Sequence, residues 1–341
     1  MRVKGQKSIR ENLSEVTASA PAKTILFGEH FVVYGKPAIV LAIDKRAYAT
    51  VTLRYDKRIH VLSKDLGASG YFENNRFLAE KGGDNVQAKL EPIMVVAKKV
   101  LNQYCGKNVG VNVEISSSIP VAAGLGSSAA VAAATAVAIS KLLNIELTRE
   151  NIFQIAYDAE KLIHGTPSGI DPAIATYGGA ILYQKDKGST RLEVEVDIPL
   201  VIGNTCMERS TGSLVAEVKR IHDSYRAIVE PIIKSGEEIV RIAVKALQDG
   251  NLAMLGELMN INHALLCAVG VSNESLEKLV LAARNAGALG AKLTGAGGGG
   301  CMIALAEPKN LNDVKKAIEQ AGGKAFVARR TADGAKIETQ G

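Results

Sequence analysis

The sequence predicts a two-domain protein of the α+β class. Its 341 residues are enough to build two ordinary hydrophobic cores. Strand-like segments dominate the opening and return near the end, whereas helical periods dominate most of the later half. Strands and helices do not alternate regularly, which favours α+β layers over a doubly wound sheet. Because the pattern changes near residue 185, we expect one domain over residues 1–185 and a second over 186–341.

The first domain is expected to contain a sheet that is covered by helices. Apolar or alternating runs predict strands at residues 16–27, 38–43, 47–53, 59–62, 110–115 and 179–183. Runs with the 3.6-residue period predict helices at residues 87–104, 127–143 and 148–164.

The second domain is expected to place a group of helices between strands. Short apolar runs predict strands at residues 192–196, 199–203, 291–294, 301–306 and 325–328. Helical periods predict helices at residues 211–234, 237–248, 252–266, 275–286 and 311–321.

Composition excludes several classes of function. The net charge of +6 comes from 41 basic and 35 acidic residues that are interspersed, so no basic run tracks a nucleic acid. Four scattered cysteines form no metal-binding pattern. Residues 121–139 are uncharged but too rich in Gly, Ser and Ala to favour a bilayer, and the N-terminus lacks the apolar centre of a signal peptide. We therefore expect a cytoplasmic protein with no membrane partner.

A glycine-rich loop opens an alanine-rich helix at residues 119–130. Gly124 and Gly126 lack a Cβ, so their N–H groups can approach an anion, and Ser127 and Ser128 suit the N-cap and first turn of the helix that follows. Free N–H groups at a helix N-terminus favour phosphate. The loop has neither the Lys of a Walker A loop nor the GxGxxG spacing, and the alternative is an ordinary glycine turn that leads into a packed helix.

Two further segments bring charged side chains to turns. In residues 20–35, Lys23 lies near the start of a strand whose far end carries Glu29 and His30; the alternative is a surface lysine and a solvated turn. In residues 158–171, Glu160 borders the apolar stripe of a helix, and a Gly/Pro turn orients Asp171; the alternative is a solvated Glu and a capping Asp. Glu-x-x-x-His is not a zinc motif.

The third segment, residues 291–301, contains five glycines within six residues. So many glycines cost chain entropy on ordering, which favours a close backbone approach to a ligand or to the other domain over a simple hairpin. If the segments converge, a carboxylate can accept the proton of a hydroxyl, Ser128 and Glu160 can hold a cation, and a lysine can neutralise developing charge. This chemistry is phosphoryl transfer from a nucleotide to an alcohol.

Together the segments resemble the motifs of the GHMP kinase superfamily. The resemblance rests on PAKTILFGEHFVVYGKPAI, GLGSSAA, HGTPSGID and KLTGAGGGGC, which extend from Ala20 to Cys301 in the family's order. It implies a two-domain fold with an N-terminal domain like ribosomal protein S5 domain 2 and a ferredoxin-like α+β C-terminal domain, with the active site between them. The first and third of these strings are most similar to the branch that phosphorylates mevalonate, an early step toward isoprenoids.

The resemblance also implies roles for residues. It makes Asp171 the catalytic base and Lys23 its charge partner, Ser128 and Glu160 ligands of Mg²⁺, and ATP the donor. Substrate-side positions are Glu29, His30 and, from the Arg-Ser-Thr segment, Thr211. A homodimer is compatible with the resemblance. The ATP-phosphate loop corresponds to Val121, Ala122, Ala123, Gly124, Leu125, Gly126, Ser127 and Ser128.

Two alternative functions stay open. The same fold could act on another alcohol, such as a sugar, homoserine or phosphomevalonate. Superfamily chains that act on galactose carry Glu-His-x-Asp-Tyr, whereas Phe31-Val32-Val33-Tyr34 follow His30 here, which disfavours a polyhydroxylated sugar. A nucleotide-binding sensor that has lost catalysis is the third reading, and the joint presence of Lys23, Glu160 and Asp171 disfavours it.

Overall fold

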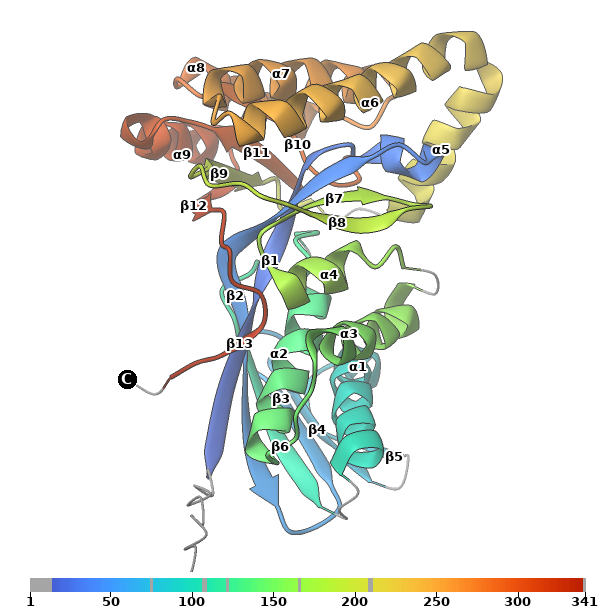
Figure 1. Cartoon of the computed structure of the whole chain (residues 1–341), viewed down its shortest axis with the longest axis vertical. Coiled ribbons are helices and arrows are strands. Elements are labelled where there is room, and N and C mark those ends of the chain that lie inside the picture. Colours follow the sequence, from blue (N-terminus) through green and yellow to red (C-terminus); the bar gives the residue numbers. More distant parts are fainter. Residues whose placement is uncertain are drawn as a thin grey trace, which may run out of the picture.

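The computed structural model describes residues 14–73, 76–105, 109–120, 123–164, 167–207 and 211–339. Within these residues the chain forms two sheets, one of nine and one of four strands, each with its own helices. Figure 1 shows the larger sheet running along the long axis of the molecule, with the smaller sheet and its helices at one end.

The larger sheet is built around two long antiparallel strands, β1 (Glu15–Phe27) and β2 (Ala38–Arg54). Its order is β13-β1-β2-β6-β3-β4-β5, and β7 pairs with the other end of β2 and with β8. Consecutive residues are buried at 18–24 of β1 and 38–43 of β2, so both faces of the sheet are covered there, whereas burial alternates at 47–51 of β2, where one face is covered. The remaining strands are β3 (Ile59–Ser63), β4 (Ala68–Glu73), β5 (Arg76–Lys81), β6 (Gly110–Ser117), β7 (Ala180–Gln184), β8 (Gly188–Leu192) and β13 (Lys336–Ile337).

Helices cover one face of this sheet (Figure 1). The central one is α2 (Ser127–Leu142), which packs on β1 and β2. Its many alanines are buried, because small side chains let the helix lie close to the strands. The N-terminus of α2 is thereby fixed beside β1. Around it pack α1 (Val86–Lys99), α3 (Arg149–His164) and α4 (Ile170–Tyr177).

The smaller sheet has the order β10-β11-β9-β12; its first three strands are buried on both faces, whereas the edge strand β12 is partly exposed. Its strands are β9 (Pro199–Asn204), β10 (Gly290–Leu293), β11 (Cys301–Leu305) and β12 (Lys324–Arg329). Its helices are α5 (Thr211–Ser224), α6 (Arg226–Gln248), α7 (Leu252–Ala268), α8 (Glu274–Asn285) and α9 (Leu311–Gln320).

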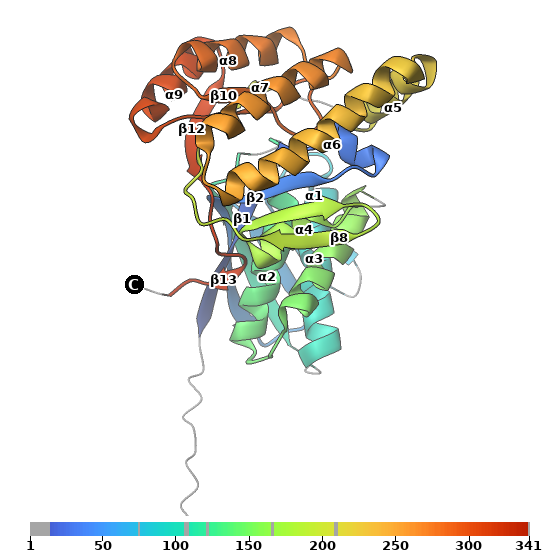
Figure 2. The same cartoon turned by 45° about the horizontal axis from the view of Figure 1, so that its top comes forward.

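The two faces of the smaller sheet join different cores. Val201, Met302 and Ala304 lie in a core with residues of α8 and α9. Ile202 and Ile303, which alternate with them along the strands, lie in the large core that continues into the first domain. The two domains therefore share buried apolar surface rather than meeting only through polar loops. Figure 2 shows α6 and α5 running across the short helix that follows β1.

The chain crosses between the domains more than once. The hairpin β7–β8 belongs to the larger sheet, so residues 188–192 pair with the first domain although they follow residue 185. Near the end of the chain, β13 returns to pair with β1. The division near residue 185 stays a prediction, with the chain passing into the smaller sheet at Pro199.

Some element predictions were wrong, for identifiable reasons. The predicted strands at 38–43 and 47–53 are one strand, because Asp44 and Lys45 form a bulge opposite β1 instead of a turn. The predicted strand at 192–196 is absent, and residues 188–192 form β8 instead. The helix break predicted at 235–236 lies at Tyr225, since Gly236 stays helical where the ring of Phe31 packs against it. The short elements β4, β5, α4 and β13 were not predicted.

In the described residues, no helix is long and apolar enough to cross a membrane.

Candidate active site

Lys23 lies in the middle of β1, where the strand passes under the glycine loop. Its backbone N–H donates to the carbonyl of Leu125 at 2.9 Å, which ties the strand to the loop. Its side chain is 10% exposed, and Nζ lies 3.2 Å from Oδ1 of Asp171. A lysine that stays charged while mostly buried needs such a carboxylate. The sheet thus presents one fixed positive charge to the loop.

The loop enters α2 through Gly126, the N-cap residue, whose φ is +74°. A Cβ on Gly126 would lie 2.9 Å from Cγ of Lys23 and 3.4 Å from Oδ2 of Asp171, so only glycine fits between them. The predicted N-cap serine is corrected here: Ser127 is the first helical residue, and no side chain caps the helix. Among the described residues, no side chain is recorded as capping this end of α2, and its N–H groups suit an anion.

Two carboxylates share the single lysine. Asp171 lies in the first turn of α4, two residues after the N-cap Gly169, whose φ of +83° turns the chain. Glu160, on α3, is only 4% exposed. Burial, together with the charge of Asp171, raises the pKa of Glu160 to about 8, and Lys23 opposes the shift. With both carboxylates ionised the site has an excess of negative charge, which a divalent cation would neutralise.

Glu29 and His30 follow the C-terminal end of β1, and His30 begins a 3₁₀ helix over His30–Tyr34. The imidazole Nε2 of His30 lies 2.7 Å from the carbonyl oxygen of Ala296, in the glycine-rich segment of the second domain. Glu29 is buried and points to Lys292. Thr211, the first residue of α5, is exposed.

A single cavity of about 610 Å³ joins these groups. It runs between the two domains, and every predicted site residue within the described ranges lines it. Val121 and Ala122 lie outside the described residues. The predicted residues that line the cavity are Lys23, Glu29, His30, Ala123, Gly124, Leu125, Gly126, Ser127, Ser128, Glu160, Asp171 and Thr211.

A second cavity, of about 220 Å³, adjoins the first through Ser127 and Ser128, which line both. Its wall is largely apolar, with Ile93, Ile115 and Val131 among its residues. Ile93, Ile115 and Val131 lie outside the sequence motifs, on α1, β6 and α2, so no motif predicts this cavity although Ser127 and Ser128 border it.

The glycine-rich segment makes the close backbone contacts that its composition predicts. A Cβ on Gly297 would lie 2.0 Å from the carbonyl oxygen of Val271, which belongs to the same domain. Gly295 and Ala296 line the cavity. Just before them, the hydroxyl of Thr294 donates to the carbonyl of Ile25 on β1 at 2.9 Å, so the segment also joins the domains.

One charged residue at the site was overlooked by sequence reasoning. Lys292 lies within the third motif and is fully buried in an ion pair with Glu29. Its only sequence signal is a lysine between Ala291 and Leu293 in a short apolar strand.

Comparisons with known proteins agree with this geometry. The model described as GHMP kinases N terminal domain matches residues 92–179, and that described as GHMP kinases C terminal matches residues 243–326. The chain is 44% identical to the mevalonate kinase of Pyrococcus furiosus over 332 residues, which covers 95% of this chain and 98% of that protein.

Two solved structures share the fold at full length. The L. major mevalonate kinase in complex with R-mevalonate superposes with a TM-score of 0.82 at 29% identity, covering 94% of this chain and 98% of that one. The Methanococcus jannaschii mevalonate kinase superposes with a TM-score of 0.81 at 29% identity, covering 93% and 99%. The similarity therefore extends over nearly the whole chain, including both domains.

Proposed function

This chain belongs to the GHMP kinase superfamily and, within it, to the mevalonate kinase family, and from that premise we propose that it transfers the γ-phosphoryl group of ATP to the 5-hydroxyl of (R)-mevalonate. The products are 5-phosphomevalonate and ADP, on a route to isoprenoids. The observation that carries the proposal is the single cavity in which Lys23, Glu160 and Asp171 face the N-terminus of α2.

Asp171 is the proposed base. The hydroxyl oxygen of mevalonate attacks the γ-phosphorus, the bond to the β–γ bridging oxygen breaks, and the hydroxyl proton passes to the Asp171 carboxylate. Lys23, 3.2 Å from that carboxylate, stabilises the negative charge that develops on the transferred group. Backbone N–H groups of residues 123–128 hold the phosphates of ATP.

Mg²⁺ fits the donor set of the cavity. Ser128 offers a hydroxyl oxygen and Glu160 a buried carboxylate, which are the hard oxygen ligands this ion prefers. We propose that these two residues hold it, and that bound Mg²⁺ neutralises charge on the ATP phosphates. Glu160 and Asp171 together exceed the charge of Lys23, which supports the binding of a cation here.

The second cavity supports a site for the nucleoside of ATP. It adjoins the phosphate loop at Ser127 and Ser128, and its apolar walls suit an aromatic base. Val131→Phe would narrow this cavity. We expect the KM for ATP to rise about tenfold while the KM for mevalonate stays within about twofold of wild type. Equal changes in both constants would contradict the assignment.

A substrate panel tests the proposed reaction. Purified protein with ATP and Mg²⁺ is given mevalonate, phosphomevalonate, homoserine or galactose, and ADP release is followed with a coupled assay. We expect turnover with mevalonate at a kcat/KM at least about a hundredfold above the other alcohols. Preference for another alcohol would assign the chain a different substrate within the superfamily. The absence of alcohol-dependent ADP release would favour a nucleotide-binding sensor that has lost catalysis.

We also propose a cytoplasmic location and a domain boundary near residue 185.

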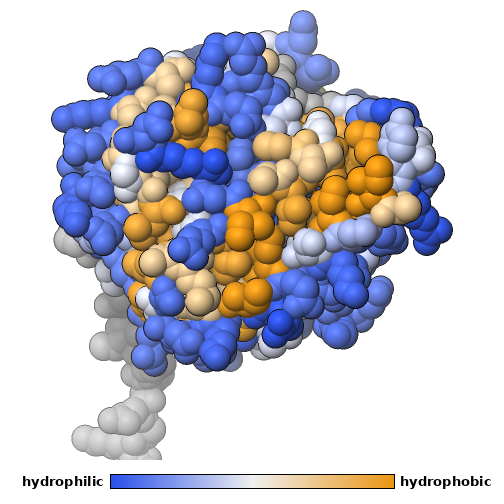
Figure 3. All heavy atoms as spheres, turned by 90° about the horizontal axis from the view of Figure 1, so that it is seen from above, coloured by the Kyte–Doolittle hydropathy of each residue, from blue (hydrophilic) through white to orange (hydrophobic). Residues whose placement is uncertain are grey.

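We further propose that the protein is a homodimer. Figure 3 supports the dimer: it looks onto the end of the molecule formed by the second domain, where apolar side chains gather in a band. Light scattering on wild type and Ile261→Lys tests it, with a dimer expected for the first and a monomer for the second. Exposed apolar residues on α6, α7 and α8 include Ile228, Ile242, Met254, Ile261 and Leu281.

A further inference from the structure

Helix α7 holds the outer edge of β10. This strand ends the order of the smaller sheet, so only one of its edges is paired with another strand. Side chains of α7 accept hydrogen bonds from the other edge: the N–H of Ala291 donates to Oδ1 of Asn260 at 3.1 Å, and the N–H of Leu293 donates to Nδ1 of His263 at 3.3 Å. Backbone donors that would otherwise be orphaned are thereby satisfied.

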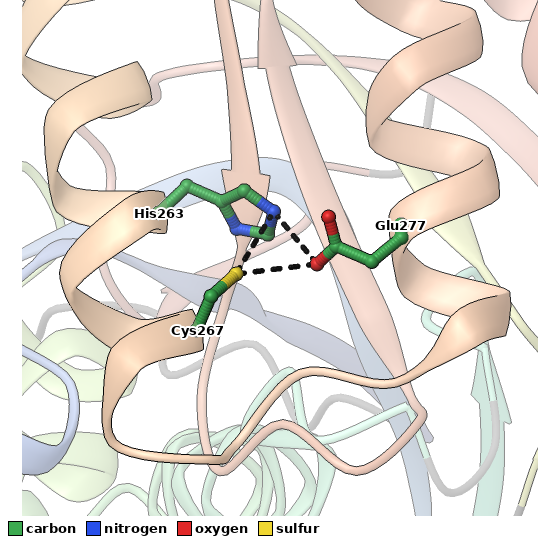
Figure 4. Close-up of side chains that lie close together, drawn as sticks. All are labelled: His263, Cys267 and Glu277. Atoms are coloured by element: carbon green, nitrogen blue, oxygen red, sulfur yellow. Dashed lines mark hydrogen bonds and ion pairs between the residues drawn. The ribbon is translucent and has the colours of Figure 1, made fainter.

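His263 belongs to a cluster whose geometry resembles a metal site. Figure 4 shows His263 and Cys267 on α7 facing Glu277 on α8. Because Nδ1 accepts from Leu293, the ring proton lies on Nε2, which donates to Oε1 of Glu277 at 3.1 Å. The thiol of Cys267 also donates to this oxygen, at 3.2 Å. The imidazole, thiol and carboxylate are thus hydrogen-bonded to one another and do not offer their lone pairs to a metal ion. The cluster instead orients His263 and holds β10 in place.

Between those two anchored residues, Lys292 points the other way. Its cross-strand partner is Ile303, which lies in the core shared with the first domain. There the ammonium meets the carboxylate of Glu29, and both side chains are 0% exposed. Nζ also donates to the carbonyl of Leu293 at 2.6 Å, and Nδ2 of Asn262 donates to Oε2 of Glu29 at 3.1 Å.

Such a pair contributes little to stability. Removing two charges from water offsets most of their attraction, and apolar residues of the same volume often serve as well. Burial accordingly lowers the pKa of Lys292. What the pair does is join two chain segments: Glu29 directly precedes His30, and Lys292 lies four residues before Ala296, the carbonyl that His30 contacts at 2.7 Å.

We propose that Lys292 is a positioning residue for the acceptor end of the cavity. Through Glu29 it sets the place of His30 relative to Ala296, with Asn262 as the second anchor of the same carboxylate. This inference rests on the proposed function, because the acceptor end is defined by mevalonate. It assigns the pair to alcohol binding and not to the nucleotide. The phosphate loop contacts β1 at Lys23, six residues before Glu29, whereas Glu29 and His30 contact the second domain at Lys292 and Ala296.

The test compares Lys292→Met with the double variant Glu29→Gln/Lys292→Met. The single change leaves a buried carboxylate without its lysine and lowers the melting temperature; the double change removes both charges and restores it. In both, we expect the KM for mevalonate to rise about tenfold, with the KM for ATP within about twofold of wild type. Lys278→Met, which breaks the exposed pair with Glu274, is the matched control and should leave both constants unchanged.

A purely structural role gives a different pattern. If the double variant regains the wild-type KM for mevalonate along with its melting temperature, or if the KM for ATP rises equally, the inference is wrong. Should Lys292→Met not fold, Asn262→Ala keeps the ion pair and removes only the second anchor; about a threefold rise in the KM for mevalonate is then expected, and no rise would overturn the proposal. Wild-type protein that does not phosphorylate mevalonate would instead refute the proposed function.

Discussion

Two lysine–carboxylate pairs differ in almost every physical respect: Lys23 and Asp171 both line the cavity, whereas the pair of Glu29 and Lys292 reaches its wall only through Glu29. Lys23 and Asp171 are 3.2 Å apart with side chains 10% and 25% exposed, and a third charge, Glu160, stands beside them. Lys292 and Glu29 are completely buried, and their neighbour is the neutral amide of Asn262. With Glu160 ionised, the first site has one more negative than positive charge, and ligands can reach it. The second pair is neutral overall, and neither of its side chains is exposed.

The difference separates chemistry from positioning. A group that exchanges protons with a substrate must be accessible to it. Its charge must also be able to interact with the bound ligand. A group that only orients its neighbours does so best when its hydrogen bonds are all internal. The residue types are the same in both pairs, so the environment decides the role.

The largest effect is expected from Asp171→Asn. The amide keeps the size of the carboxylate but cannot accept the hydroxyl proton, so kcat should fall about 10³-fold while ATP binding stays within about twofold of wild type. Turnover and calorimetric titration with ATP measure the two quantities. Undiminished turnover would refute the assignment of the base.

A smaller loss is expected from Lys23→Met. It removes the positive charge 3.2 Å from Asp171, and the expected fall in kcat is about 10²-fold. Lys36→Met removes an ion pair with Glu237 outside the cavity and serves as the control. Similar values of kcat for Lys23→Met and Lys36→Met would show that Lys23 has only a structural role.

Gly126→Ala tests how tightly the loop packs on the first pair. The new Cβ would contact Cγ of Lys23 at 2.9 Å and force a residue at φ +74°, so we expect kcat to fall about tenfold and stability by about 1–2 kcal/mol. Gly35→Ala has a similar φ of +76° with no atom within 4 Å. Steady-state kinetics and urea unfolding should show the stability loss in both and the kinetic loss only at Gly126.

The last expected effect concerns the pH dependence of stability and not the rate of phosphoryl transfer. The pKa of Glu160 is about 8 in the folded protein against 4.5 ordinarily, so the folded state holds an extra proton between these values. Stability without Mg²⁺ should therefore fall as pH rises from about 5 to 8, by at most about 1.4 kcal/mol per pH unit.

Glu160→Gln should lose this slope in urea unfolding measured with a chelator, whereas the exposed Glu146→Gln should retain it. If the slopes of wild type and Glu160→Gln coincide, burial does not protonate Glu160.

Sequence motifs indicated Glu29 and the proposed reacting pair, whereas nothing in the sequence indicated the role that we propose for Lys292. Lys23, Glu160 and Asp171 lie in motifs whose local pattern of glycine, proline and charge indicates a site. Lys292 sits in a short strand, where a lone lysine is normally exposed; its burial depends on Glu29, 263 residues away in the chain. Likewise, Gly236 reads as a helix break until the ring of Phe31 is placed against it. Local signals predict turns and motifs, whereas long-range contacts decide burial.

The most direct test of the contrast is the single-turnover rate of phosphoryl transfer, measured by rapid quench at saturating ATP and mevalonate. Asp171→Asn should lose this rate by about 10³-fold, whereas Glu29→Gln/Lys292→Met should keep it within about threefold of wild type once mevalonate saturates. Equal losses in the two proteins would contradict the division between a reacting pair and a positioning pair.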